Sequence, residues 1–149
     1  MKRTPLLAAW GALFLLLAPS LLAQDVTVSG AWVRPTPPYV TRTALYATLH
    51  NAGGREDRLI AVAAEIAERA EIHETVIEGG MLRMQPVAGG VAVPAGGEAQ
   101  LKPGGYHVML SGLKSAIWRG GSVAVTLTFE HAGAVRIEAV AADEPPPAE

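Results

Sequence analysis

The sequence predicts an all-β fold, either an antiparallel sandwich or a barrel. Several segments alternate between apolar and polar residues with a period of two, which is the pattern of half-buried strands. Turns rich in glycine or proline separate these segments at intervals of about 8–12 residues, as in sandwiches and barrels. Helical periodicity is scarce. These observations favour one domain of short strands joined by tight turns.

The first 23 residues are predicted to be a secretory signal peptide. Lys2 and Arg3 precede an apolar run over 6–18, and Ala23 offers a small residue for cleavage. An uncleaved membrane anchor is the alternative, but the run is shorter than the ~20 residues that a spanning helix needs. The protein is therefore expected in the periplasm, without stable membrane insertion after cleavage.

The chain that remains after cleavage is mildly acidic and has no cysteine. Loss of Lys2 and Arg3 leaves ten basic side chains and 14 acidic ones, a net charge of −4 with the histidines neutral. Such a chain lacks the basic face that nucleic-acid binding requires. Without cysteine there is no disulfide, no thiol catalysis and no thiolate ligand for a metal. Stability must come from packing alone.

The expected strands follow one another along a single domain over 24–140. In "SVAVTLTFE" the residues Val123, Val125, Leu127 and Phe129 share one face, and threonines occupy the other. "RTALYATLH" and "AVRIEAV" alternate in the same way. The complete set of expected strands is 25–33, 42–50, 57–63, 70–76, 82–87, 98–102, 106–110, 122–130 and 134–140.

Two segments stand apart from this pattern. "AVAAEIAERAEI" at 61–72 is rich in alanine and glutamate, which favour a helix, but it fits two strands around an exposed turn equally well. The acidic, proline-rich tail over 141–149 is expected to be disordered.

Methionine and histidine residues gather in one part of the chain. Apart from the initiator, the methionines are Met81, Met84 and Met109, and they lie near His73 and His107. Ten residues separate His73 from Met84, 22 separate Met84 from His107, and one separates His107 from Met109. Residues two apart in a strand point to the same face with Cα atoms ~6.8 Å apart, so His107 and Met109 can converge on one small object.

Two imidazoles and two thioethers form a donor set that suits Cu(I). Magnesium and calcium require hard oxygen ligands, and zinc prefers thiolate or carboxylate to thioether. A soft sulfur pairs best with a soft cation. A blue-copper electron-transfer centre needs a cysteine sulfur, which this chain lacks. The chemistry points to a site that carries copper.

Other interpretations of these residues remain open at this stage. A lone methionine usually fills a core, and a metal-free periplasmic immunoglobulin-like interaction module is the main alternative function. His50 and His131 have no methionine partner and are expected to be structural or exposed. Met81, three residues from Met84, would lie on the opposite strand face and is left out of the set. A copper enzyme ranks last, because two histidines support Cu(II) redox cycling poorly.

Several stretches of the sequence resemble the periplasmic copper chaperones of the PCu(A)C type. The resemblance is carried by "AEIHETVIEGGMLRMQPV", "VPAGG", "LKPGGYHVMLSGLK" and "GSVAVTLTFE". It extends upstream through "AWVRPTPP" and "NAGGREDRLI", and it covers nearly all of 25–140.

The resemblance implies a cupredoxin-like Greek-key antiparallel β-sandwich and a non-enzymatic function. It implies one Cu(I) ion held by His73, Met84, His107 and Met109. It further implies delivery of that ion to the binuclear centre in the copper-containing subunit of cytochrome c oxidase, together with Sco-type thiol proteins. The tail contains neither histidine nor methionine, so one copper per chain is expected. Nearby acids (Glu71, Glu74 and Glu78) could offset the charge of the ion.

Overall fold

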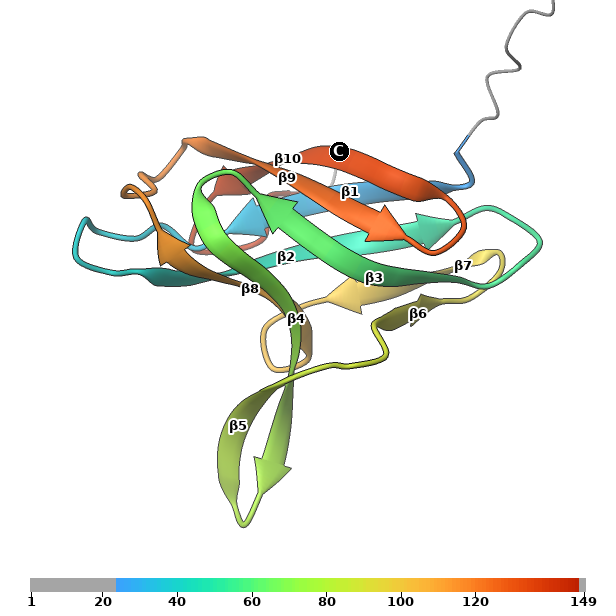
Figure 1. The fold of residues 1–149 in the computed structure, drawn as a ribbon, viewed down its shortest axis with the longest axis horizontal. Helices are drawn as coiled ribbons and strands as arrows, with labels where there is room; N and C mark the ends of the chain where they lie inside the picture. The colour runs from blue at the N-terminus through green and yellow to red at the C-terminus, as the bar shows by residue number, and fades with distance from the viewer. Residues whose placement is uncertain (1–23, 148–149) are drawn as a thin grey trace, which may run out of the picture.

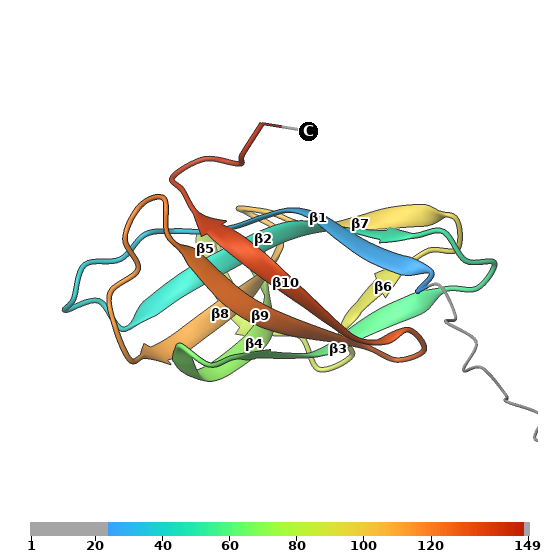
Figure 2. The same ribbon diagram turned by 90° about the horizontal axis from the view of Figure 1, so that it is seen from above.

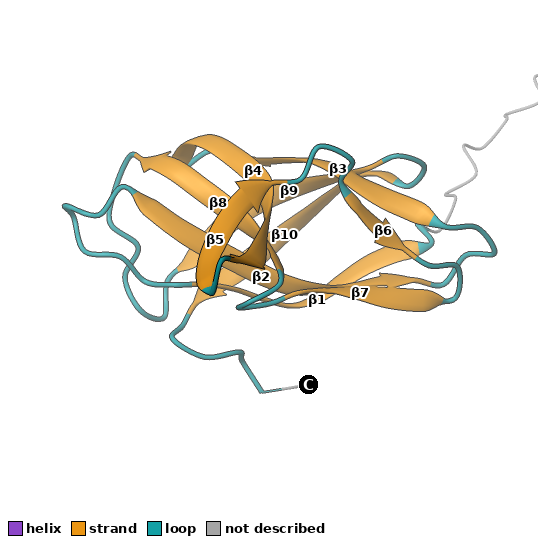
Figure 3. Cartoon of the chain, turned by 90° about the horizontal axis from the view of Figure 1, so that it is seen from below, coloured by secondary structure: helices purple, strands orange, loops and turns teal. Residues whose placement is uncertain are grey.

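The structure, a computed structural model, describes residues 24–147. The predicted signal peptide over 1–23 lies outside the described residues. Within them the chain forms strands and loops, and no helix is present that could cross a membrane (Figure 3). The strands are β1 (Val26–Val33), β2 (Arg42–Asn51), β3 (Asp57–Ala64), β4 (Ala67–Glu78), β5 (Met81–Pro86), β6 (Val91–Val93), β7 (Gly97–Leu101), β8 (Tyr106–Leu113), β9 (Ser122–Phe129) and β10 (Gly133–Ala141).

The strands pair in the order β5-β4-β8-β2-β1-β10-β9-β3-β6, and β7 pairs with β2 off this path. Most neighbours are antiparallel, whereas β1 and β10 pair in parallel through Trp32 and Val33. The path folds over on itself, so that β9 and β10 lie across from β2 and β8 (Figures 1 and 2). The all-β sandwich predicted from the period-two pattern is confirmed.

The space between the two layers is filled by the apolar residues that the alternation selects. On β9 every second residue is buried, which confirms the predicted inward face. On β8 the core face carries Val108 and Leu110, both fully buried, while His107 and Met109 belong to the opposite face. The first half of β2 departs from alternation, because Thr43 to Ala47 are all buried. Its outer face is covered as well as its inner one.

The segment over 61–72 forms strands and not a helix. It contains the end of β3, a turn at Glu65 and Ile66, and the start of β4. β3 pairs with β9 and β4 pairs with β8, so ladder hydrogen bonds override the helical preference of alanine and glutamate. The short strand β6 was not predicted, because three residues are too few to show an alternation.

A hairpin of β4 and β5 projects from the body of the sandwich (Figure 1). All six residues of β5 are exposed, and β5 forms one end of the strand order. Gly79 and Gly80 connect the strands with φ values of 58° and 79°. Both values are in the left-handed region, as a two-residue type I′ turn requires. The hairpin therefore holds its strands in a fixed register although it lacks a core of its own.

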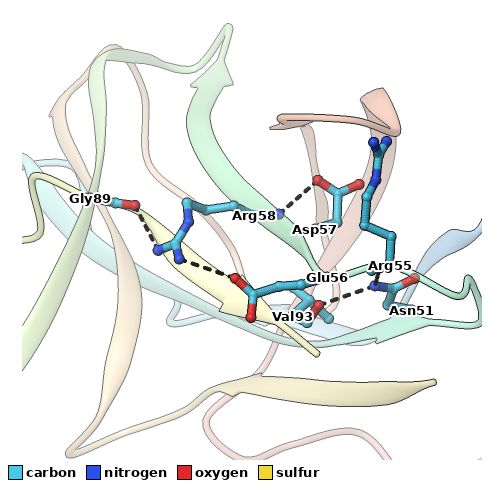
Figure 4. Close-up of polar contacts among 7 residues, drawn as sticks. All are labelled: Asn51, Arg55, Glu56, Asp57, Arg58, Gly89 and Val93. Carbon is cyan, nitrogen blue, oxygen red and sulfur yellow. Dashed lines mark hydrogen bonds and ion pairs between the residues drawn. The ribbon is translucent and has the colours of Figure 1, made fainter. Parts of the chain in front are cut away.

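Two buried polar side chains organise the loops at the end of the sandwich where β3 begins (Figure 4). Asn51 donates hydrogen bonds to the carbonyl oxygens of Arg55 and Val93, at 2.8 and 3.1 Å. The carboxylate of Asp57 accepts backbone N–H groups of Arg58 and His131 at Oδ1, and that of Ala132 at Oδ2. These bonds fasten the start of β3 to the turn between β9 and β10.

The carboxyl group of Asp57 has a lowered pKa. Its burial taken alone raises the pKa, but the backbone hydrogen bonds from His131, Arg58 and Ala132 and the positive charge of His131 outweigh that effect. The ionised form of the Asp57 carboxyl is therefore more stable in the folded protein than in the unfolded chain.

After β10 the chain continues without regular structure to the last described residue, Pro147. Arg119 forms an ion pair with Asp143, and the prolines 145–147 line a cavity together with residues of β1. The described part of the tail thus lies against the domain.

Candidate metal site

His73 on β4 and His107 on β8 lie directly opposite each other in the antiparallel ladder. Residues opposite each other in such a ladder point to the same face. Their ring centroids are 6.0 Å apart, and the rings are inclined by 59°. The two histidines that the sequence separates by 33 positions are thus neighbours on the outer face of the sheet.

The ring of His107 is held in one orientation and one tautomer. Its Nδ1 lies 3.0 Å from the carbonyl oxygen of Gly105. A carbonyl can only accept a hydrogen bond, so Nδ1 carries the proton and Nε2 keeps a free lone pair. Metal-binding histidines commonly donate their second N–H to a carbonyl in this way. The side chain is 1% exposed, and its Nε2 atom is buried without a hydrogen-bond partner.

The carbonyl that orients His107 belongs to the "KPGG" turn between β7 and β8. The same oxygen of Gly105 accepts the backbone N–H of Thr75 on β4, at 3.2 Å. Gly105 itself donates to the carbonyl of Lys102, which closes the turn. Gly104 has a φ of 79°, a value that favours glycine. The turn and β4 together fix the position of this carbonyl.

Both ring nitrogens of His73 are also buried without a hydrogen-bond partner. Its Nε2 is 3.5 Å from a carboxylate oxygen of Glu71, which is within ion-pair distance but does not form a hydrogen bond. Buried polar atoms are normally paired, because leaving one unpaired costs free energy. Three unpaired ring nitrogens on two facing histidines therefore indicate a site that takes a ligand.

Met109 and Met84 lie on the same face as the two histidines. Met109 is two residues beyond His107 on β8 and opposite Glu71 on β4. Met84 on β5 is opposite Thr75, which is two residues beyond His73. Diagonal neighbours in a ladder have Cα atoms ~7–8 Å apart, within reach of long side chains. Met109 is half-buried, whereas Met84 is 58% exposed.

The register also separates residues that the sequence left ambiguous. Met81 is opposite Glu78 and belongs to the other face of the hairpin. Of the three acids that could offset a bound cation, Glu71 alone shares the face of the histidines. Glu74 and Glu78 belong to the opposite face, where they contact Gln85 and Arg83.

An aromatic stack borders the site on the side of β2, and sequence reasoning missed it. The ring of Tyr46 lies 6.3 Å from that of His107 and 4.6 Å from that of Trp32. The Arg34 guanidinium lies 5.9 Å from the centroids of both Trp32 and Tyr46, a cation–π distance. This stack explains why both faces of β2 are buried. Only the alternation of Tyr46 with core residues could have indicated it.

The two remaining histidines lie away from His73 and His107. His50 contacts Ser29 through Nε2 at 2.7 Å and Glu98 through Nδ1 at 3.5 Å. His131 lies in the turn after β9, where its backbone N–H donates to Asp57. Both positions agree with the structural or exposed roles expected of them.

Imidazole and carboxylate groups alone do not complete a site. Within residues 24–147, no three side chains of His, Asp or Glu are arranged so that they could hold a metal ion. Two imidazoles with free nitrogens and two thioethers on one face form the donor set that remains. Such a set suits a soft ion and offers little to magnesium or calcium.

Solved structures of PCuAC domains share this fold. The "Copper-bound PCuAC domain from PmoF2" superposes with a TM-score of 0.65 at 27% identity, over 82% of this chain and 94% of that one. "CuI-DR1885 from Deinococcus radiodurans" superposes with a TM-score of 0.64 at 33% identity, over 83% of this chain and 82% of that one. The fold is therefore a cupredoxin-like β-sandwich of the PCuAC type, as the sequence resemblance implied.

The chain belongs to the LpqE-like family. The family described as "Putative lipoprotein LpqE-like" matches residues 26–141. A relative in Leifsonia xyli subsp. xyli, "Putative lipoprotein Lxx21020", is 35% identical over 111 residues, which is 74% of this chain. The match spans 66% of the length of that relative, slightly less than two thirds.

Proposed function

We propose that this protein is a periplasmic, non-enzymatic carrier that binds one Cu(I) ion through His73, Met84, His107 and Met109. The copper is cargo, and the four side chains are neutral ligands that a partner can replace one at a time. The observation that carries the proposal is the pair of facing histidines with unpaired ring nitrogens, on the face shared with Met84 and Met109.

The differing exposure of these side chains suits a carrier. His107 is buried and oriented by Gly105, so it would form the fixed part of the site. Met84 is largely exposed on a projecting hairpin, so it would be the ligand that a partner reaches first. Solved PCuAC domains that contain copper or CuI support the choice of metal.

The acceptor is proposed from the resemblance to PCu(A)C chaperones. It would be the copper-containing subunit of cytochrome c oxidase, with Sco-type thiol proteins acting in the same delivery. The absence of cysteine from the sequence supports a division of labour, because this chain cannot reduce a disulfide in its acceptor. Reduction would be left to the thiol protein.

Met84→Ala and Met81→Ala form a matched pair that tests the site. Met84→Ala is expected to weaken Cu(I) binding about tenfold or more, judged against the ~10–100-fold lost with outer-shell partners of metal sites. Met81→Ala removes an equally exposed thioether three residues away, on the other face, and is expected to leave the affinity unchanged. The measurement is anaerobic titration with Cu(I) against a competing chelator.

One tight equivalent in the parent protein, weakened only by Met84→Ala, supports the proposal. Equal losses in the two variants would mean that the hairpin binds copper loosely through any thioether. No tight equivalent in the parent would exclude the carrier function and favour a metal-free interaction module.

A further inference from the structure

The two loops at one end of the sandwich form a single unit, which adjoins the aromatic stack beside the candidate metal site through Arg34. Residues 34–41 connect β1 to β2, and residues 114–121 connect β8 to β9. Both loops lie at the left in Figures 1 and 2, opposite the end where β1 begins. Thr36 and Ile117 exchange two backbone hydrogen bonds, of 2.9 and 3.1 Å, that hold the loops together.

Each loop exposes one aromatic side chain. Tyr39 is 84% exposed and Trp118 is 67% exposed. Exposing a large aromatic group costs hydrophobic free energy, and two of them in linked loops suggest that this end is covered in use. We refer to Tyr39, Trp118 and the cations around them as the aromatic-basic end.

The charge of this end is opposite to that of the protein as a whole. The two loops and the first residue of β2 contain four cations and no acid, namely Arg34, Arg42, Lys114 and Arg119. Arg69 joins them, because it is paired with Ser111, which is paired with Arg42.

Acidic groups reduce this charge but do not cancel it. Asp143 forms an ion pair with Arg119. The backbone carbonyl of Glu65 accepts a hydrogen bond from Lys114 Nζ, and the side chain of Glu68 lies beside Gly112. Glu144, which follows Asp143 directly, is a fourth acid, so five cations and four acids leave this end with a net charge of +1. The rest of the mature chain then carries −5, since the whole carries −4.

We propose that the aromatic-basic end binds the surface of an anionic phospholipid membrane. Tryptophan and tyrosine prefer the headgroup region of a bilayer, and each nearby lysine or arginine adds attraction to anionic lipid. The anionic membrane repels the acidic remainder of the chain, so the protein would bind with the aromatic-basic end facing the membrane. An acidic protein surface is disfavoured as the partner, because two loop tips provide little of the ~800 Å² that each side of a stable protein interface buries.

This orientation leaves the candidate metal site accessible. The β4–β5 hairpin projects sideways from the body and not from the aromatic-basic end (Figure 1). A protein resting on the membrane through its loops would hold Met84 free for a partner. The proposal does not depend on the copper function, because it is tested on the metal-free protein.

Tryptophan fluorescence offers a direct test, because the chain from residue 24 contains two tryptophans, buried Trp32 and exposed Trp118. The probe is vesicles of phosphatidylethanolamine with phosphatidylglycerol, compared with vesicles of phosphatidylcholine alone. The protein is expected to sediment with the anionic vesicles. Binding should shift the emission of Trp118 to the blue and protect its fluorescence from quenching by acrylamide. High salt should reverse the binding.

The variants separate the aromatic contribution from the charge contribution. Tyr39→Ser with Trp118→Ser is expected to abolish sedimentation with vesicles. Arg42→Gln with Arg119→Gln is expected to weaken it about 30-fold, at roughly 1 kcal/mol for each cation lost. The matched control is Arg55→Gln with Arg136→Gln, which removes two cations outside this end and should change nothing.

Three results would overturn the proposal. One is failure of the parent protein to bind anionic vesicles, and another is binding that the Tyr39→Ser, Trp118→Ser variant retains. The third is equal binding of the parent to anionic and to phosphatidylcholine vesicles, which would show that the cations of this end do not direct the binding.

Discussion

Replacing His107 by leucine is expected to abolish tight Cu(I) binding while leaving the metal-free fold as stable as the parent or slightly more stable. Both halves of this result follow from one feature. The ring nitrogen Nε2 of His107 is buried without a partner. It therefore destabilises the metal-free fold, and it is available as a ligand to a bound ion. A histidine that served only the core would behave in the opposite way.

The stability half can be reasoned from hydrogen bonds. The substitution loses the bond from Nδ1 to Gly105, worth about 1 kcal/mol, and that carbonyl still accepts the N–H of Thr75. It also removes the unpaired Nε2, and an unsatisfied buried polar atom costs about 1–3 kcal/mol. Leucine is close to histidine in volume, so the substitution leaves no large cavity. The free energy of unfolding should therefore change by between zero and a gain of about 2 kcal/mol.

The loss of Cu(I) affinity in His107→Leu is expected to exceed about 100-fold, because even the loss of an outer-shell partner commonly lowers metal affinity ~10–100-fold. A ligand that binds only the folded state raises its stability, by about 4 kcal/mol at a thousand times its dissociation constant. The parent protein should thus melt at a higher temperature with Cu(I), and the variant should not.

Calorimetry of apo and Cu(I)-loaded protein measures both halves in one experiment. His50→Leu is the matched control, since His50 is an exposed histidine away from the site. It should keep the stabilisation by Cu(I). A variant at His107 that loses stability without copper, or gains it with copper, would contradict the role assigned to this residue.

The sequence was sufficient to predict a strand wherever one face of that strand is buried and the other is exposed to solvent. The alternation on β9 is an example, because each of its residues has only one of two environments. It was insufficient where partners decide the outcome. Residues 61–72 have the composition of a helix, and they form strands because β8 and β9 supply hydrogen-bonding partners. No local pattern contains that information.

The same distinction applies to the candidate site. The positions of His107 and Met109 two residues apart place them on one face without any knowledge of the fold. The pairing of His73 with His107, and the choice of Met84 over Met81, depend on the register of three strands. Tyr46 and the Gly105 carbonyl act on His107 from β2 and from a turn, and backbone carbonyls carry no signal in a sequence. The spacing in the sequence suggested the donor set. The strand register shows that its four members share one face and that Met81 does not.

Asp57→Asn is expected to destabilise the protein by about 2–3 kcal/mol at neutral pH and by much less in acid. The carboxylate accepts three backbone N–H groups through its two oxygens. An amide keeps one oxygen and turns an NH₂ group toward the remaining N–H donor. The side chain is 5% exposed, so water cannot readily replace the lost acceptor.

The pH dependence follows from the lowered pKa of Asp57. Because the folded pKa lies below the unfolded value, about 3.9 for an aspartate, the carboxylate stabilises the fold at every pH above that value. This contribution is lost as the pH falls through the folded pKa, where the carboxyl becomes protonated in both states. The gap between parent and variant should therefore be constant near neutrality and close below about pH 4.

Urea unfolding of both proteins at a series of pH values measures this gap. Glu56→Gln is the matched control, because Glu56 is the neighbouring acid but is exposed and paired only with Arg58. An exposed pair contributes little, about 1 kcal/mol or less, so its curve should follow the parent. A gap for Asp57→Asn that stays the same from neutral pH into acid would show that the charge of Asp57 does not stabilise the fold. The hydrogen bonds would then act through geometry alone, and the protonated carboxyl of Asp57 would hold β3 to the β9–β10 turn as well as the carboxylate does.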